Sequence, residues 1–381
     1  MKMLRDPRLL VRGFSFLALL LATAGCGGLK PTGSHVVGHL APRTGPEQAA
    51  GLRQGLAVAM TVEDFNVVEE NRIERLPITV IHGDTGPEID GFGFQATRLL
   101  AVNHAEALLG ATRAAELDKL APEVQSGQVV LVSPCGGNAG TLNRLIFSVG
   151  LDPRERGRLL ASFAVEERKV TEIALVTSGS QAIFAAATEA FAREFQHADR
   201  KIRHELTYRE RKELDEIVAR LRGAKPGALF FSGPVADLLA LRAVMKEVPI
   251  FFGGEECEAA LRPEAQASEG IVFATAFHAD AGSPKAKDFV TKLQARSKQQ
   301  LVDADDALSA DAARLLFDAA KKANSFDKEK LTTALNGLEG YECLTGPFWF
   351  TPEQSARRTV YIAQMAAGKS SLLKEYPPEK K

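Results

Sequence analysis

The sequence predicts an α/β fold made of two lobes, each built around a parallel central sheet. Short apolar runs alternate with amphipathic segments along the chain, which is the pattern of strand–helix–strand crossover units. The alternation starts afresh after Gly150-Leu151-Asp152-Pro153. The length of 381 residues also suits two lobes, since a domain takes about 150 residues.

The first 150 residues supply the elements of one lobe. Apolar runs predict strands at Val36–Leu40, Pro77–Ile81, Glu106–Leu109 and Val129–Val132. Apolar residues three or four positions apart predict helices at Gln48–Phe65, Gly93–Val102 and Ala114–Leu120. Right-handed crossovers between parallel strands would make this a Rossmann-like lobe.

The next 130 residues repeat the pattern. A helix over Arg154–Arg168 is expected to begin at the N-cap Asp152. Strands are expected at Ile173–Thr177, Ala228–Phe231, Pro249–Phe252 and Ile271–Thr275, with helices at Gln181–Phe195 and Val235–Lys246. The charges of Tyr208–Arg222 alternate in sign, as they do on a solvated helix.

Three later helical patterns predict that the chain returns to the first lobe. These patterns, Pro284–Gln299, Ala307–Ala323 and Lys328–Asn336, come too late for the second sheet and are expected to join the first. The lobes are therefore joined by three hinge crossovers, which we expect near Gly150, Phe277 and Thr345.

These crossovers define the expected lobes. Residues 35–150 and 278–345 form the first, and residues 151–277 and 346–370 the second, with late strands at Gly346–Phe350 and Thr359–Ala363. Residues 371–381 are expected to be a frayed charged tail. Because parallel sheets bind ligands beyond the carboxyl ends of their strands, two facing edges predict a cleft that closes on a ligand.

The amino terminus has the pattern of an export signal. Four basic residues precede the apolar run Phe14–Ala22, which is too short to span about 30 Å of hydrocarbon comfortably. Thr23-Ala24-Gly25-Cys26 resembles a bacterial lipobox, with Thr23 where Leu is usual. We expect residues 1–25 to be a lipoprotein signal peptide, Cys26 to be acylated and residues 26–34 to form a tether. The alternative is an ordinary secretory signal in which Cys26 has no part.

Composition narrows the class of protein and its partners. The net charge is −1, and it becomes −4 when residues 1–25, with four basic residues and one acidic residue, are removed. Nucleic acid is not an expected partner, because neutralisation of phosphates drives that binding. Hydrophobic residues at 45% and charged residues at 25% exclude a disordered chain. Four cysteines are too few for a disulfide-dense scaffold.

Seven segments carry a resemblance to a known family. They are Ala41-Pro42-Arg43-Thr44-Gly45-Pro46, Asp84 with Pro87, Val132-Ser133-Pro134, Phe147–Gly157, Phe251-Phe252-Gly253-Gly254-Glu255, Ala267–Phe277 and Leu344-Thr345-Gly346-Pro347-Phe348. In their order and spacing they resemble the branched-chain amino-acid (Leu/Ile/Val) class of type I periplasmic binding proteins, which serve ABC transporters. The resemblance runs from about Val36 to about Met365 at low local identity.

The resemblance implies a set of ligand-binding residues in the first lobe. The family holds the ligand's carboxylate with backbone N–H groups and hydroxyls, and these places fall at Ala114, Cys135, Gly136 and Gly137. Backbone amides suit an anion because they carry a fixed partial positive charge. Ala114 and Gly137 stand where the family has hydroxyls, so two donors are lost.

In the second lobe the family meets the ligand's ammonium with an acidic residue, and Glu255 stands in that place. Aromatic side chains usually surround the ligand, but those places read Ala50, Gln181 and Pro234. The loss of three rings predicts a larger and less apolar cavity. We therefore expect a ligand that is larger and more polar than leucine.

Arg113 has two interpretations of equal weight. It is next to the place of the family's anion loop, so it could pair with a ligand carboxylate at the cleft edge. It could equally be a solvated arginine at the start of a helix.

Other motifs favour no further chemistry, and no metal or cofactor is expected. His35 and His39 share a strand face without a third metal ligand at a suggestive spacing. Ala366-Ala367-Gly368-Lys369-Ser370 lacks the earlier glycine of a P-loop. Thr177-Ser178-Gly179-Ser180 is not the nucleophile elbow of a serine hydrolase, and no nucleophile–base–orienter set is found.

Three cysteines remain if Cys26 is acylated, namely Cys135, Cys257 and Cys343. The resemblance puts Cys135 and Cys257 on loops of opposite lobes near the cleft. A bond between them would lock the cleft, so free and largely buried thiols are expected.

Together these features predict a lipid-anchored solute-binding protein at the extracytoplasmic face of a membrane. It would capture a small amino-acid-like or amide-type ligand for an ABC permease. Two alternatives use the same fold: a receptor that signals ligand occupancy to a partner, and an enzyme or structural envelope lipoprotein whose cleft is filled.

Overall fold

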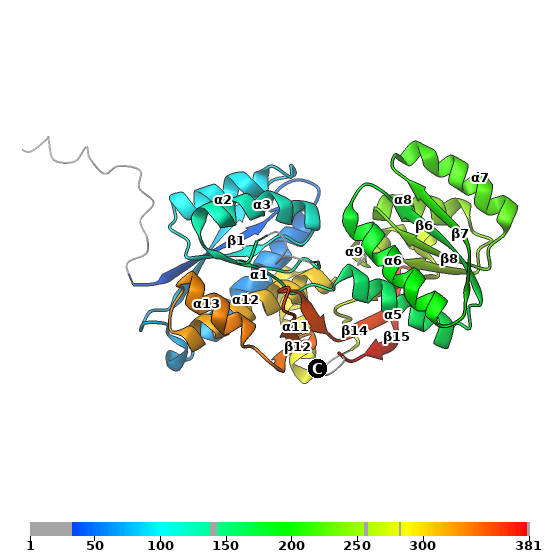
Figure 1. Cartoon of the computed structure of the whole chain (residues 1–381). Coiled ribbons are helices and arrows are strands. Elements are labelled where there is room, and N and C mark those ends of the chain that lie inside the picture. Colours follow the sequence, from blue (N-terminus) through cyan, green and yellow to red (C-terminus); the bar gives the residue numbers. More distant parts are fainter. Residues whose placement is uncertain (1–32, 138–142, 255–257, 282, 379–381) are drawn as a thin grey trace, which may run out of the picture.

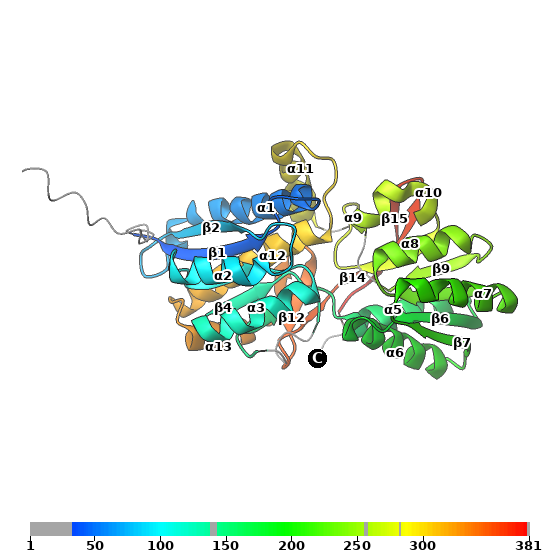
Figure 2. The same cartoon turned by 90° about the horizontal axis from the view of Figure 1, so that it is seen from above.

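The computed structural model describes residues 33–137, 143–254, 258–281 and 283–378. Two lobes lie side by side in it (Figures 1 and 2). The predicted acylation site Cys26, the predicted ligand residue Glu255 and Cys257 lie outside the described residues.

The first lobe contains a five-stranded parallel sheet in the order β2-β1-β3-β4-β5. Its strands are β1 His35–Ala41, β2 Ile78–Asp84, β3 Ala107–Gly110, β4 Val130–Ser133 and β5 Ile146–Ser148. Successive side chains of a strand point to opposite faces, and both faces are apolar here. Val37, Leu109 and Val132 belong to one core, whereas Val36, Leu108 and Leu131 belong to another.

The second lobe contains a seven-stranded sheet in the order β15-β14-β10-β9-β8-β6-β7. Its strands are β6 Glu172–Ser178, β7 Lys201–Tyr208, β8 Ala228–Ser232, β9 Ile250–Gly253, β10 Ile271–Thr275, β14 Val360–Ala366 and β15 Lys369–Tyr376. Strands β6 to β10 are parallel, and β14 and β15 add an antiparallel edge. The predicted two-lobed α/β fold is confirmed.

Helices cover both faces of the first sheet. They are α1 Gln48–Asn66, α2 Gly91–Ala101, α3 Ala114–Gly127, α11 Pro284–Ser297, α12 Ala304–Ala323 and α13 Lys328–Asn336, with the 3-10 turn η1 Glu69–Asn71. Figure 1 shows α2 and α3 on one face and α1, α12 and α13 on the other. The three late helices therefore join the first lobe, as predicted.

The second sheet is covered in the same way. Its helices are α5 Pro153–Glu166, α6 Ala182–His197, α7 Leu214–Ala224, α8 Val235–Val244 and the short α9 Glu258–Leu261 and α10 Ala265–Ser268, with 3-10 turns η2 Arg211–Glu213 and η3 Arg262–Glu264. Helix α5 begins as predicted, with the Asp152 carboxylate accepting a hydrogen bond from the Arg154 N–H at 2.8 Å. Within the described parts of the chain, the helices are too short or too polar to cross a bilayer.

Three segments connect the lobes. β5 continues through residues 149–152 into α5, and β10 returns through residues 276–283 to α11. A small antiparallel sheet of β11 Tyr341–Cys343, β12 Gly346–Phe350 and β13 Ala356–Arg358 then precedes β14.

This small sheet corrects the predicted third crossover. It is attached to the first lobe, because the Ser148 N–H donates to the Gln354 carbonyl at 2.9 Å and the Phe350 ring packs on Phe147. Residues 346–358 therefore do not belong to the second lobe, and the chain crosses at Thr359 rather than near Thr345.

Two further predictions of secondary structure are wrong. Tyr208–Arg222 is not one solvated helix, because Tyr208 ends strand β7, with its side chain buried, and helix α7 starts only at Leu214. The expected tail of residues 371–381 is also incorrect, since its first six residues belong to β15 and pair with β14.

Candidate functional site

The carboxyl edges of both main sheets face the neighbouring lobe. The carboxyl end of β5 continues directly into the second lobe, and the carboxyl end of β10 continues back into the first. Because β1 to β5 are parallel, as are β6 to β10, the other strands of each set end at the same edge. Helix α9, which comes after β9, lies on the side of the second lobe that faces the first (Figure 2).

The loop after β4 brings three predicted ligand residues to the first of these edges. The Cys135 N–H donates to the Ala111 carbonyl and to the Ser133 hydroxyl, both at 3.1 Å, so this amide is already engaged inside the lobe. In contrast, the N–H groups of Gly136 and Gly137 have no acceptor within the described residues. Two of the three predicted amide donors are therefore not engaged by the described part of the chain.

Both glycines are required by the backbone around them. A Cβ on Gly136 would lie 2.0 Å from the carbonyl oxygen of Leu151, which is part of the first crossover. Gly137 has a φ of 135°, a conformation that favours glycine, and open space lies where its side chain would be. Its carbonyl accepts a hydrogen bond from the Ser355 hydroxyl at 2.7 Å.

Arg113 and Ala114 lie at the start of α3, after β3, and the half-buried Ala50 lies in the first turn of α1. Arg113 is exposed and forms an ion pair with Glu47, the residue before α1, and a second with the buried Glu116. The hydrogen bond to Glu47 raises the pKa of Arg113, and the Arg113 guanidinium lowers the pKa of the Glu47 carboxyl.

The second lobe contributes Gln181 and Pro234 to its facing edge. Gln181 is the exposed N-cap of α6 and follows β6, whereas the half-buried Pro234 is the N-cap of α8 and follows β8. Neither side chain is aromatic, so these two positions bring no aromatic ring to the edge.

Sequence reasoning missed several polar residues at this second edge. The Tyr208 hydroxyl donates to the buried Asp237 carboxylate at 2.8 Å, and burial, followed by this contact, raises the pKa of Tyr208. The hydroxyl of Ser178, the last residue of β6, lies 2.8 Å from that of Ser180 in the turn that follows. The Ser-Gly-Ser sequence directly after an apolar strand could have indicated the two serines. Tyr208 gave no such signal, because it begins a charged run that was assigned to a solvated helix.

The predicted histidines belong to separate contacts. The His35 ring nitrogens lie near the Glu106 carboxylate and the Ile73 carbonyl, whereas Nδ1 of His39 lies 2.9 Å from Nδ1 of His82 on the neighbouring strand. Burial is the main cause that lowers the pKa of both His39 and His82, the latter to about 4. The described residues contain no cluster of three His, Cys, Asp or Glu side chains suited to a metal ion.

The cysteines of the described chain are buried. The Cys135 thiol is a hydrogen-bond donor to the Gly136 carbonyl at 3.2 Å. Burial raises the pKa of the Cys343 thiol, which disfavours its reactive thiolate form.

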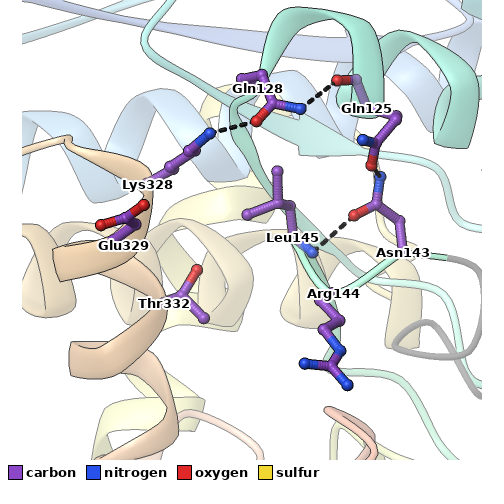
Figure 3. A pocket seen from close by; sticks show the side chains of 8 residues that line it. All are labelled: Gln125, Gln128, Asn143, Arg144, Leu145, Lys328, Glu329 and Thr332. Atoms are coloured by element: carbon purple, nitrogen blue, oxygen red, sulfur yellow. Dashed lines mark hydrogen bonds between the residues drawn. The ribbon is translucent and has the colours of Figure 1, made fainter.

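A pocket of about 520 Å³ lies away from these edges, at the amino end of the first sheet (Figure 3). Its lining residues are mostly polar: Gln125, Gln128, Asn143, Arg144, Leu145, Lys328, Glu329 and Thr332. Figure 3 shows their amides bonded to each other, as in the 2.9 Å contact from Asn143 to Gln125. No predicted ligand residue lines this pocket.

Comparisons with known proteins agree with this arrangement. A family model described as periplasmic binding protein matches residues 35–370. A leucine-binding protein from Thermotoga maritima is 19% identical with a TM-score of 0.78, and the match covers 90% of this chain and 99% of that one.

Other similar structures were solved with ligands of different kinds. A branched-chain amino-acid binding protein of Streptococcus pneumoniae, in complex with isoleucine, is 18% identical over 91% of this chain and 100% of that one, with a TM-score of 0.76. A solute-binding protein of Rhodopseudomonas palustris, in complex with p-hydroxybenzoic acid, is 17% identical over 91% and 98%, with a TM-score of 0.77. A search of curated proteins found no match.

Proposed function

The chain belongs to the family of periplasmic binding proteins, and on this premise we propose that it captures a small solute between its two lobes for an ABC transporter. The observation that carries the proposal is the pair of facing carboxyl edges, because open parallel sheets bind ligands there. Binding would close the lobes, and the closed form would present one continuous surface to the transporter.

The chemistry of the first edge favours a carboxylate as one end of the ligand. The amides of Gly136 and Gly137 offer fixed partial positive charge, and Arg113 stands at the same edge. Isoleucine and p-hydroxybenzoic acid, bound by two of the similar structures, both carry a carboxylate.

The second edge favours a ligand with a polar far end. Hydroxyls of Ser178 and Ser180 lie there, and Gln181 and Pro234 replace the rings that would enclose an aliphatic side chain. Glu255 would add a negative charge for an ammonium group. We therefore propose an amino-acid-like or amide-bearing solute that is more polar than leucine, with no chemical conversion of it.

The amino-terminal sequence supports a lipid anchor outside the cytoplasm. The export signal and the small residues before Cys26 favour acylation of that cysteine, and residues 27–34 would tether the first lobe to the membrane. The proposal thus describes a lipid-anchored solute-binding protein of the cell envelope.

Native mass spectrometry of residues 27–381, purified without a tag from the periplasm, tests this function. We expect a co-purified solute of small mass that carries a carboxylate and that raises the unfolding temperature when added back. A protein that retains no solute, and that no amino acid, amide or aromatic acid stabilises, would contradict the proposal.

A further inference from the structure

An ion pair spans the carboxyl edge of the first sheet. Glu47 precedes α1, whose buried residues belong to the core on one face of the sheet, and Arg113 precedes α3, whose buried residues belong to the core on the other. Both terminal nitrogens of the Arg113 guanidinium donate to the two oxygens of the Glu47 carboxylate. The pair therefore bridges the two helical layers at the edge where a ligand would lie.

The orientation of Arg113 is fixed from behind by Glu116. Its Nε donates to Glu116 Oε1 at 2.7 Å, and Glu116 Oε2 accepts from the backbone N–H groups of Thr112 and Arg113 at 2.9 and 3.2 Å. The Glu116 side chain is only 4% exposed, so its contact with Arg113 is held within the protein and not in solvent. The two terminal nitrogens of the guanidinium then bind Glu47 in the fork geometry that suits a carboxylate.

Glu47 differs from Glu116 in its surroundings. The Glu47 side chain is 46% exposed and that of Arg113 is 55% exposed, and an exposed pair of this kind adds little to folding stability. The contact between Arg113 and the Glu47 carboxylate has, however, the same chemistry as a contact between an arginine and the carboxylate of a ligand.

The loop after β4 is hydrogen-bonded to the segment that precedes Arg113. The Cys135 N–H donates to the Ala111 carbonyl, which joins the loop of Gly136 and Gly137 to the segment that leads into Arg113. A ligand carboxylate at this edge would therefore find both a guanidinium and backbone amides.

We propose that Arg113 is the receptor for the ligand's carboxylate and that Glu47 is a built-in competitor which the ligand displaces. This inference rests on the proposed function and names one interaction within it. It means that only a carboxylate, and not the neutral amide of the same shape, replaces Glu47 without leaving the guanidinium unpaired. The competitor also weakens the binding of every carboxylate ligand by a constant factor.

Isothermal titration with glutamine, p-hydroxybenzoate and the neutral analogue p-hydroxybenzamide tests the inference, because both carboxylates have the polar far end that the second edge favours. We expect E47Q to bind at least one of the two carboxylates about tenfold more tightly than the wild-type protein, with p-hydroxybenzamide unchanged. R113M should lose this binding. E172Q is the matched control, because Glu172 pairs with Arg203 at similar exposures of 45% and 53%, at the amino ends of β6 and β7, away from the edge.

Unfolding curves of each variant establish that it is folded. If folded E47Q binds neither carboxylate more tightly than the wild type, including the case in which no variant binds them, the inference is overturned. If the wild type retains a cellular solute but E47Q shows no gain, the proposed function stands and the role of Glu47 fails. Retention of no solute by any variant would instead contradict the function.

Discussion

One buried arginine connects the hinge segments. The Arg358 guanidinium donates to the Val149 carbonyl in the first crossover and to the Thr345 hydroxyl, and it lies 3.8 Å from the buried Asp311 carboxylate. Asp311 in turn accepts a hydrogen bond from the Leu344 N–H at 2.7 Å. A single side chain thus holds the first crossover, the small sheet and α12 together just before the chain enters the second lobe.

Replacement of Arg358 should destabilise the protein strongly. In R358M the Asp311 carboxylate stays buried without its cation, and removing one partner of a buried ion pair costs about 3–5 kcal/mol. Urea unfolding measures this change. R357M is the control, because Arg357 is exposed on the same strand and should change stability by less than about 0.5 kcal/mol. Equal effects of the two substitutions would contradict the role of Arg358.

The residues of the candidate site were only partly predictable. The sequence placed Gly136 and Gly137 after a strand, but it could not show that the neighbouring Cys135 amide is used by Ala111, since that contact joins two loops. For Arg113 it left two interpretations open, because its partner Glu47 lies 66 positions away. Contacts at such separations depend on the tertiary fold, which local patterns do not encode.

A pair of neutral histidines lies between the first two strands and the helix above them. His39 of β1 is in register with His82 of β2, and Gly55 of α1 lies next to their rings. Burial lowers the pKa of both, with the nearby Arg43 charge acting in the same direction. Folding therefore favours the unprotonated rings.

This pair predicts a loss of stability in mild acid. The pKa of His82 falls from 6.5 when unfolded to about 4 when folded, so its contribution is complete above pH 6.5 and is lost as the pH falls toward 4. Between pH 7.5 and pH 5 the wild type should lose about 2 kcal/mol through His82 alone. In H82Q this loss should be smaller, whereas H197Q, which changes an exposed histidine of α6, should behave as the wild type. Urea unfolding at the two pH values measures this loss. An equal loss of unfolding free energy in H82Q and wild type would contradict the role of His82.

Among the strands that the sequence did not predict, which include the three-residue β5, β11 and β13, the two long ones are the edges of the second sheet. β7 has an exposed, charged surface along most of its length, and β15 alternates exposed and half-buried residues. Edge strands often carry charges that discourage further pairing, and this removes the apolar run by which a strand is recognised. The interior strands, apolar on both faces, were all found.

At the scale of the whole molecule, the order of elements determined most of the architecture. Three late helices had no place in the second sheet, and they pack on the first, as expected. The third crossover was predicted at the wrong place. Phe348 and Phe350 give the small sheet an apolar face, and the sequence pattern alone does not show which lobe that face packs on. The packing of Phe350 against Phe147 places the small sheet in the first lobe.

Hydrogen exchange of the protein with and without its captured solute tests the central claim most directly. If the solute lies between the lobes, exchange should slow in both at once, in segments 111–116 and 133–137 of the first lobe and 178–183 and 232–237 of the second. Slower exchange in one lobe only, or around the distant pocket of Gln125 and Lys328, would contradict the account.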